Sequence, residues 1–195
     1  ARGWAALKGG HLEEAEQMAD AVLASAPRDD KAEAEAYYLR AQARGKRGNF
    51  HGALEDYESA LEIVPNSIAI MLDQGGVLHT LDRFEDALSV AEAILKIDAQ
   101  HAVAHNNRGL MLRELARLDG AEMALRCALQ CDDAYHDARV NLALALIEQG
   151  RLQEAESELA RVLEVDRGHV DARWNRAIMH LLRGEFAAGW RDYEI

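Results

Sequence analysis

Apolar and polar residues alternate along the chain with the rhythm of a helix. Within one stretch, the apolar or small residues Phe50, Ala53, Tyr57, Ala60 and Leu61 fall three or four positions apart, and polar residues fill the gaps. This spacing places the apolar residues on one face of a helix. Similar stretches follow one another throughout the 195 residues, and only 2 prolines interrupt them. The pattern therefore predicts an all-α chain.

A longer period is superimposed on this rhythm. When the chain is divided into frames of 34 residues that begin at Ala34, similar residues recur at equivalent positions. The eighth position always carries a small residue: Ala41, Gly75, Gly109, Ala143 and Ala177. The fifteenth position carries Gly48, Gly150 and Gly184, with Asp82 and Ala116 in the two other frames. One frame upstream, when four extra residues are allowed in the connection, Gly10 occupies the same position.

Each frame predicts two helices that are joined by a tight turn at the fifteenth position. Glycine at this position supplies the positive φ that ends the first helix. Small residues allow the two helices to approach closely, and large ones interdigitate. Because one such pair cannot bury its own apolar face, the pairs must stack into a solenoid.

One frame also matches the pattern of a known family. In Ala34–Ser67 the matching residues are Tyr37, Ala41, Gly48, Phe50, Ala53, Tyr57, Ala60 and Pro65. The chain therefore resembles a tetratricopeptide-repeat (TPR) protein. The resemblance implies one right-handed α-solenoid of antiparallel helix pairs over residues 1–195, with five to six units, of which the first and last are incomplete. The expected units are 1–29, 34–67, 68–101, 102–135, 136–169 and 170–195.

Composition and charge narrow the function classes. A formal net charge of -12 disfavours nucleic acid and anionic membranes as partners. The sequence contains no stretch of 18 apolar residues, so it predicts no membrane-spanning helix. Cys127 and Cys131 lie four positions apart on one predicted helix, where a disulfide would constrain little. We interpret them as buried or half-buried free thiols, which favours a cytoplasmic location.

The charge is not distributed evenly between the two helices of a frame. The first-helix segments are neutral to slightly basic, whereas the turns and second helices carry the net negative charge. The resemblance implies that first helices line a concave groove. Cationic groove candidates are Arg40, Arg44, Arg108, Arg113, Arg139, Arg173 and Arg176, and such a groove favours neutral to acidic partner segments. The alternative is that these arginines form ion pairs within a repeat.

Polar and aromatic residues of the first helices complete the expected groove. Asn107, Asn141 and Asn175 occupy the same frame position, and Asn106 lies beside the first of them. A primary amide both donates and accepts, so a row of amides pairs with a peptide backbone whatever its side chains. This row resembles the asparagine ladder of O-linked N-acetylglucosamine transferases. Tyr38 and Trp174 are candidate partner anchors, or else cover the core of a neighbouring repeat.

Catalytic signals are absent from the sequence. It contains no phosphate-binding glycine loop, no H-E-x-x-H motif and no nucleophile elbow. His101 and His105 are four apart but lack a Cys or carboxylate cluster with metal-site spacing. We therefore expect no catalytic residue, no metal and no cofactor. The Lys and Asn pattern with which chaperone-binding relatives clamp a terminal carboxylate is also missing.

The C-terminal residues add one more resemblance. Gly189 and Trp190 stand where alanine and an aliphatic residue are usual, as in the last repeat of bacterial TPR proteins that carry a glycosyltransferase-like domain. The sequence thus favours a non-enzymatic scaffold whose groove binds an extended peptide or a partner helix. The alternative is the substrate-recruiting region of a larger enzyme, such as a glycosyltransferase, with its catalytic part beyond Ile195. Self-association through exposed solenoid ends is a further possibility.

Overall fold

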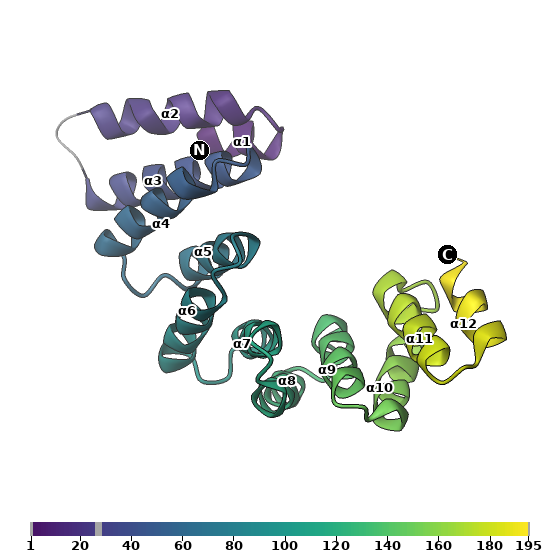
Figure 1. Ribbon diagram of the computed structural model, residues 1–195. Coiled ribbons are helices and arrows are strands. Elements are labelled where there is room, and N and C mark those ends of the chain that lie inside the picture. The colour runs from purple at the N-terminus through teal and green to yellow at the C-terminus, as the bar shows by residue number, and fades with distance from the viewer. Residues whose placement is uncertain (1, 26–28, 195) are drawn as a thin grey trace. The chain divides into compact units, whose positions relative to one another are not determined.

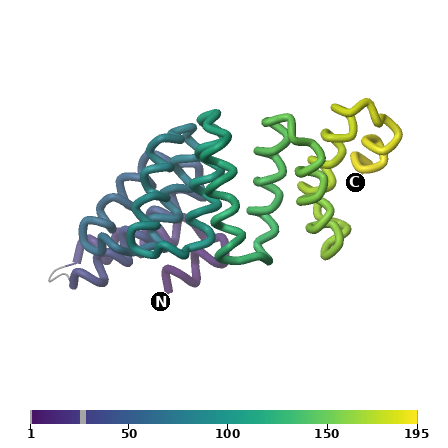
Figure 2. The backbone as a smooth tube through the Cα atoms, turned by 90° about the horizontal axis from the view of Figure 1, so that it is seen from below, coloured from purple at the N-terminus to yellow at the C-terminus, as the bar shows by residue number. Residues whose placement is uncertain are grey.

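The computed structural model describes residues 2–25 and 29–194 and shows twelve helices and no strand within them (Figure 1). Residues 26–28, which belong to the expected unit 1–29, lie outside the described residues. Consecutive helices are joined by tight turns and pack against one another in pairs, and Figure 2 shows the chain winding back and forth along these helices. The all-α fold of helix pairs that the sequence predicts is therefore confirmed.

The chain divides into two compact units, residues 1–97 and 98–195. The first unit consists of α1 (Arg2–Lys8), α2 (Leu12–Ala24), α3 (Asp30–Lys46), α4 (Phe50–Ile63), α5 (Ile68–Thr80) and α6 (Phe84–Ile97). The second consists of α7 (Ala102–Glu114), α8 (Leu118–Cys131), α9 (His136–Glu148), α10 (Leu152–Val165), α11 (Val170–Leu182) and α12 (Phe186–Tyr193). The continuity of residues 1–195 as one solenoid stays a prediction.

The turn inside each pair has the same backbone geometry in all six frames. Gly10, Gly48, Gly150 and Gly184 have φ between 76° and 83°, as expected from the sequence. Asp82 and Ala116 adopt φ of 56° although they carry a Cβ. In each turn, a backbone N–H just beyond this residue donates to a carbonyl five positions earlier, for example from Arg117 to Leu112 at 2.8 Å. This is the Schellman motif, which satisfies carbonyls that the helix end would otherwise leave unpaired.

The left-handed conformation of Ala116 predicts a stabilising substitution. A residue with a Cβ loses about 1–2 kcal/mol in this region, whereas glycine does not. We expect Ala116→Gly to raise the free energy of unfolding by about 1 kcal/mol, after the added freedom of the unfolded glycine chain is subtracted. Urea denaturation measures this change. Gly150→Ala, at the equivalent turn, is the matched control and should lower stability by a similar amount; a destabilised Ala116→Gly variant would contradict the geometry.

Small residues lie where the paired helices meet. Ala41, Ala143 and Ala155 are fully buried. At Gly109 of α7, an added Cβ would come within 2.5 Å of the Leu125 side chain of α8. The small residues at the repeated positions therefore set the close approach of the two helices of a pair, as the sequence predicts.

Candidate functional site

Three first helices of the second unit enclose a polar hollow, which we call the amide hollow. Its volume is about 440 Å³, within the range of ligand-binding pockets. One side chain comes from α7, four come from α9 and two from α11. They are Asn106, Asp137, Val140, Asn141, Leu144, Asp171 and Asn175.

Asn106 and Asn141 connect two consecutive helix pairs across this hollow. The Asn141 Nδ2 donates to the Asn106 Oδ1 at 2.9 Å. Asn106 is buried, with 6% of its surface exposed, and Asn141 is half-buried. Asn107, the residue in register with Asn141 in the sequence, is half-buried and does not line the hollow. The row of amides thus begins at Asn106, because the neighbouring pair lies against this face of α7.

Asn175 is the amide that points most clearly to a ligand. Only 5% of the residue is exposed, yet it lines the amide hollow. Within the described part of the chain, its side chain forms no hydrogen bond. The amide of Asn175 is therefore available to pair with a ligand in the hollow. Asn141 also keeps its Oδ1 and one N–H for further hydrogen bonds.

Two carboxylates that the sequence analysis missed lie at the same hollow. Asp137 and Asp171 are exposed, and each occupies the first turn of its helix, α9 or α11. Neither forms a hydrogen bond or an ion pair with another described residue. Burial raises the pKa of the nearby Tyr135 phenol, and the negative charges of Asp137 and Asp132 raise that pKa further. The signal was available in the sequence, since Asp137 and Asp171 are also 34 residues apart.

Two of the five expected groove arginines in this unit, Arg139 and Arg173, are held by other residues of the fold. Arg139 is 5% exposed and pairs with Glu158 at 2.8 Å and Asp133 at 2.6 Å. Burial opposes its charge, but the two carboxylates hold the pKa of Arg139 above its ordinary value. Arg173 donates to the backbone carbonyls of Arg191 and Glu194, at the end of α12. Their guanidinium groups therefore stabilise the fold instead of facing a partner.

Arg108 and the remaining arginines lie outside the amide hollow. Arg108 is half-buried on α7. The other expected groove cations are in ion pairs. Arg40 and Arg44 both contact Asp56, Arg176 contacts Asp192, and Arg113 contacts Glu114 and Glu148. The Arg40–Asp56 and Arg176–Asp192 pairs occupy equivalent positions in two frames and link the first helix to the second. Arg40, Arg44, Arg113 and Arg176 thus form ion pairs within a repeat, as the alternative expects, and Arg113 also pairs with Glu148 of the following repeat.

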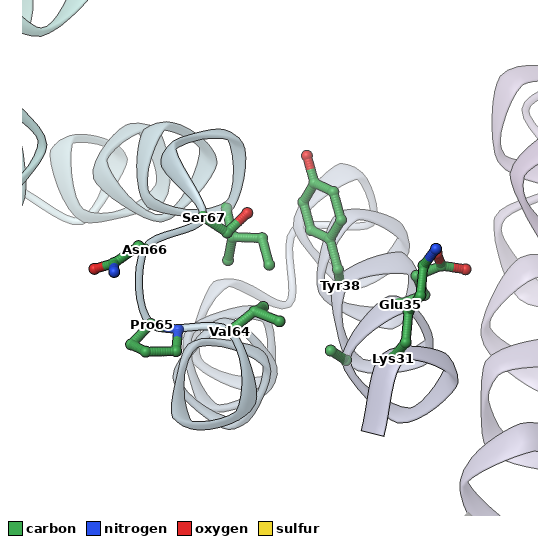
Figure 3. A pocket seen from close by; sticks show the side chains of 9 residues that line it. Lys31, Glu35, Tyr38, Val64, Pro65, Asn66 and Ser67 are labelled. Atoms are coloured by element: carbon green, nitrogen blue, oxygen red, sulfur yellow. The ribbon is translucent and has the colours of Figure 1, made fainter. Parts of the chain in front are cut away.

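Tyr38 lies in the first unit and lines a separate hollow of about 520 Å³, which we call the Tyr38 hollow. Its hydroxyl donates to the Asp73 Oδ2 at 2.7 Å, and Gln42 donates to the same oxygen at 2.6 Å. Burial, and then Asp73, raise the pKa of the Tyr38 phenol well above its ordinary value. Figure 3 shows Val64, Pro65, Asn66 and Ser67 on one side of this hollow and Tyr38, Lys31 and Glu35 on the other. Tyr38 is therefore fixed in place at the Tyr38 hollow of the first unit.

Trp174 is exposed on α11, next to Asn175, but its ring turns to another surface. The ring lies 5.0 Å from that of Tyr193 on α12, centroid to centroid. Trp174 is not among the residues that line the amide hollow. The second unit therefore brings together Asn106, Asn141 and Asn175, and leaves Trp174 on a different face.

The described residues were also searched for metal-binding groups, reactive cysteines and membrane-spanning helices. Within residues 2–25 and 29–194, no three His, Cys, Asp or Glu side chains are placed to hold a metal ion. Cys127 is half-buried and Cys131 is exposed, so the expectation that both are at least half-buried is wrong for Cys131. Among the described helices, none combines the length and apolar character needed to cross a membrane. His101 and His169 instead serve as N-caps, since the Nδ1 of each accepts from a backbone N–H of α7 or α11.

Two family models match the chain, and both are described as tetratricopeptide repeat. One covers residues 34–67, and the other covers residues 112–181. The first match has the same bounds as the frame that carries the clearest sequence pattern. No curated protein sequence matches the chain significantly.

Solved structures with the same fold cover most of the chain. A tetratricopeptide-repeat protein from Parabacteroides merdae is 21% identical, with a TM-score of 0.89, and the match covers 99% of this chain and 75% of that one. TTC0263, a thermophilic TPR protein from Thermus thermophilus, is 27% identical, with a TM-score of 0.70 and coverage of 92% and 95%. YrrB, described as a TPR protein with an unusual peptide-binding site, is 23% identical, with a TM-score of 0.62 and coverage of 82% of each chain. These descriptions name no glycosyltransferase, so that resemblance of the last repeat stays a prediction.

Proposed function

Because this chain belongs to the tetratricopeptide-repeat family, we propose that it is a protein-interaction scaffold whose amide hollow binds an extended segment of a partner protein. TPR proteins are generally scaffolds without enzymatic activity, and YrrB is described as a TPR protein with an unusual peptide-binding site. The observation that carries the proposal is the amide of Asn175, which lines the hollow and forms no hydrogen bond with another described residue. We propose that the chain itself has no catalytic activity.

Amides suit the recognition of a peptide backbone. An extended segment presents N–H and C=O groups that no helix or sheet satisfies. Asn175 offers one acceptor oxygen and two N–H donors, and Asn141 offers the groups that its bond to Asn106 leaves free. Val140 and Leu144 add an apolar part of the wall. The hollow therefore supports binding that depends on the backbone more than on the partner sequence.

The carboxylates at the hollow change the expected charge of the partner. A preference for acidic segments would require free cations, but Arg139 and Arg173 are engaged within the fold. Asp137 and Asp171 are exposed and line the hollow instead. We therefore propose a partner segment that carries lysine or arginine, with an affinity that falls as salt screens the attraction.

A random library of displayed dodecapeptides provides the probe. Peptides selected on the whole chain should be enriched in lysine and arginine and should lose affinity in high salt. For a selected lysine-containing peptide, Asp137→Asn with Asp171→Asn should raise the dissociation constant about 2- to 30-fold, since an exposed ion pair contributes about 0.2–1 kcal/mol. Fluorescence anisotropy measures the change.

The control variant has the same net charge as the variant that carries Asp137→Asn and Asp171→Asn. Glu55→Gln with Glu164→Gln also removes two exposed carboxylates, but neither residue lines the amide hollow. This control should leave the dissociation constant within about twofold of the original value. Selected peptides rich in aspartate and glutamate, or an equal loss of affinity in both double variants, would show that the hollow does not select basic segments.

A further inference from the structure

Two free cysteines lie one helical turn apart on α8, and we call them the thiol pair. Cys127 is half-buried and Cys131 is exposed, so neither residue is enclosed in the core. The backbone N–H of Asp132 donates to the Ala128 carbonyl at 2.9 Å, which shows that the helical geometry continues through Cys131. Residues four positions apart in a helix share one face, with Cβ atoms about 5–6 Å apart. The two thiols are therefore neighbours on the surface of α8.

Packing of the helix pairs does not account for sulfur at these positions. The equivalent positions of other frames carry residues that differ in size and polarity. They are Ser59, Ala93 and Arg161 in place of Cys127, and Ile63, Ile97 and Val165 in place of Cys131. The fold thus accepts other side chains at both positions, and the chemistry of the thiols is the property that sets this helix apart.

Helix geometry opposes a disulfide within the thiol pair but suits a bound metal ion. A disulfide needs Cβ atoms about 3.5–4.5 Å apart, which is less than the separation of two residues one turn apart. A metal ion bridges a wider gap, because two metal–sulfur bonds of about 2.3 Å place opposed sulfurs about 4.6 Å apart. Rotation about χ1 of each cysteine brings the sulfurs to this separation while α8 stays helical.

The number of ligands selects the metal. In residues 2–25 and 29–194, no three His, Cys, Asp or Glu side chains are placed to hold a metal ion. A structural Zn²⁺ site requires four ligands, so the thiol pair does not complete one. Cu(I) is a soft ion that prefers sulfur ligands and is stable between two thiolates. The thiol pair therefore matches Cu(I) both in the type and in the number of its ligands.

The end of α8 also favours a cation. Cys131 is the last residue of this helix, where backbone carbonyls without a helical partner carry partial negative charge. Asp132 follows directly, and its carboxylate accepts from the Ala134 N–H at 3.0 Å. A positive ion bound beside Cys131 offsets this negative potential.

We propose that Cys127 and Cys131 bind one Cu(I) ion as a pair of thiolates. Each thiol releases its proton to the solvent and its sulfur donates an electron pair to the metal, so two protons leave for each ion and copper keeps its oxidation state. The thiol pair lies on α8, whereas α7, α9 and α11 line the amide hollow. The copper site is therefore independent of peptide binding, and a failure of either proposal leaves the other standing.

Titration of the whole, reduced chain with Cu(I) under nitrogen tests the proposal, with bicinchoninate as a competing chromophoric chelator. The chain should withdraw one equivalent of copper from the chelator and develop a thiolate-to-copper charge-transfer band in the ultraviolet. Cys127→Ser and Cys131→Ser should each weaken binding about 100-fold or more, because each removes one of only two ligands. Sedimentation equilibrium should give the same mass with and without copper.

Two relocated thiols separate the geometry of the site from the number of thiols. Met123 is 69% exposed and lies one turn before Cys127 on α8. Met123→Cys combined with Cys131→Ser restores a pair four positions apart and should again bind one ion. Asp119→Cys combined with Cys131→Ser is the matched control, since its thiols lie about 12 Å apart along the helix and should not share an ion. Circular dichroism checks that both variants keep the helix content of the original chain.

Three results would overturn the copper site. The first is a chain that leaves all copper with the chelator, or a serine variant that binds as well as the original. The second is equal binding by the Met123→Cys and Asp119→Cys combinations, because thiols would then bind copper whatever their spacing. The third is a mass that doubles when copper is added, because thiolates of two copies would then share the ion.

Discussion

Asp56→Ala is expected to lower the free energy of unfolding by about 1.5–3 kcal/mol, because Arg40 and Arg44 lose their shared partner, although each keeps a second ion pair, with Asp20 and Glu16. Asp56 is 2% exposed on α4. It accepts from the Arg40 Nη2 at 2.7 Å and lies 2.9 Å from the Arg44 Nη1. Both arginines belong to α3, so the Asp56 carboxylate connects α3 to α4 by ion pairs. Urea denaturation followed by circular dichroism at 222 nm measures the loss.

Two further variants separate the ion pair from general damage to α4. Glu58→Ala removes an exposed carboxylate of the same helix and should change stability by less than about 0.5 kcal/mol. Replacing Asp56, Arg40 and Arg44 together by apolar residues of similar size should cost much less than Asp56→Ala, because no charge is then left buried. An Asp56→Ala variant within about 1 kcal/mol of the original chain would contradict the structural role of the cluster.

Combined replacement of Asn106, Asn141 and Asn175 by alanine is expected to weaken peptide binding about 10- to 2,000-fold. Each hydrogen bond contributes about 0.5–1.5 kcal/mol, so the loss of three amides amounts to about 1.5–4.5 kcal/mol. The probe is a dodecapeptide selected on the original chain, and anisotropy measures its dissociation constant. Because the amides contact the backbone, peptides of unrelated sequence should lose similar factors.

Asn107→Ala is the control for this variant, since Asn107 lies beside Asn106 on α7 but does not line the amide hollow. It should leave binding within about twofold of the original. Unchanged binding in the triple variant, with helix content preserved, would rule out recognition by the amides.

The fold was predictable from the sequence because its signals are local and repeat. Small residues at the eighth position and glycine at the fifteenth recur often enough to define helix pairs. The same turn conformation also forms where the sequence lacks glycine, since Ala116 and Asp82 adopt the positive φ that glycine adopts in the other turns. The framework of neighbouring pairs imposes the turn even where the local residue disfavours it.

The candidate site was only partly predictable, because side-chain partners depend on distances that a frame does not give. Asn141 and Asn175 were identified from their period. Asn106 replaces Asn107 because a step of one residue rotates a side chain by about 100° around the helix. The arginines were assigned to a groove by their helix, but carboxylates on neighbouring helices pair with them, as Glu158 does with Arg139.

The most direct test of the account is an NMR titration that observes the side-chain amides of the chain. The ¹⁵N–¹H resonances of Asn106, Asn141 and Asn175, assigned with the single alanine variants, are followed as a selected dodecapeptide is added. If the amides bind the peptide, the Asn141 and Asn175 side-chain resonances shift with saturation and yield the dissociation constant found by anisotropy. Unchanged asparagine resonances, with shifts confined to residues around the Tyr38 hollow, would contradict it.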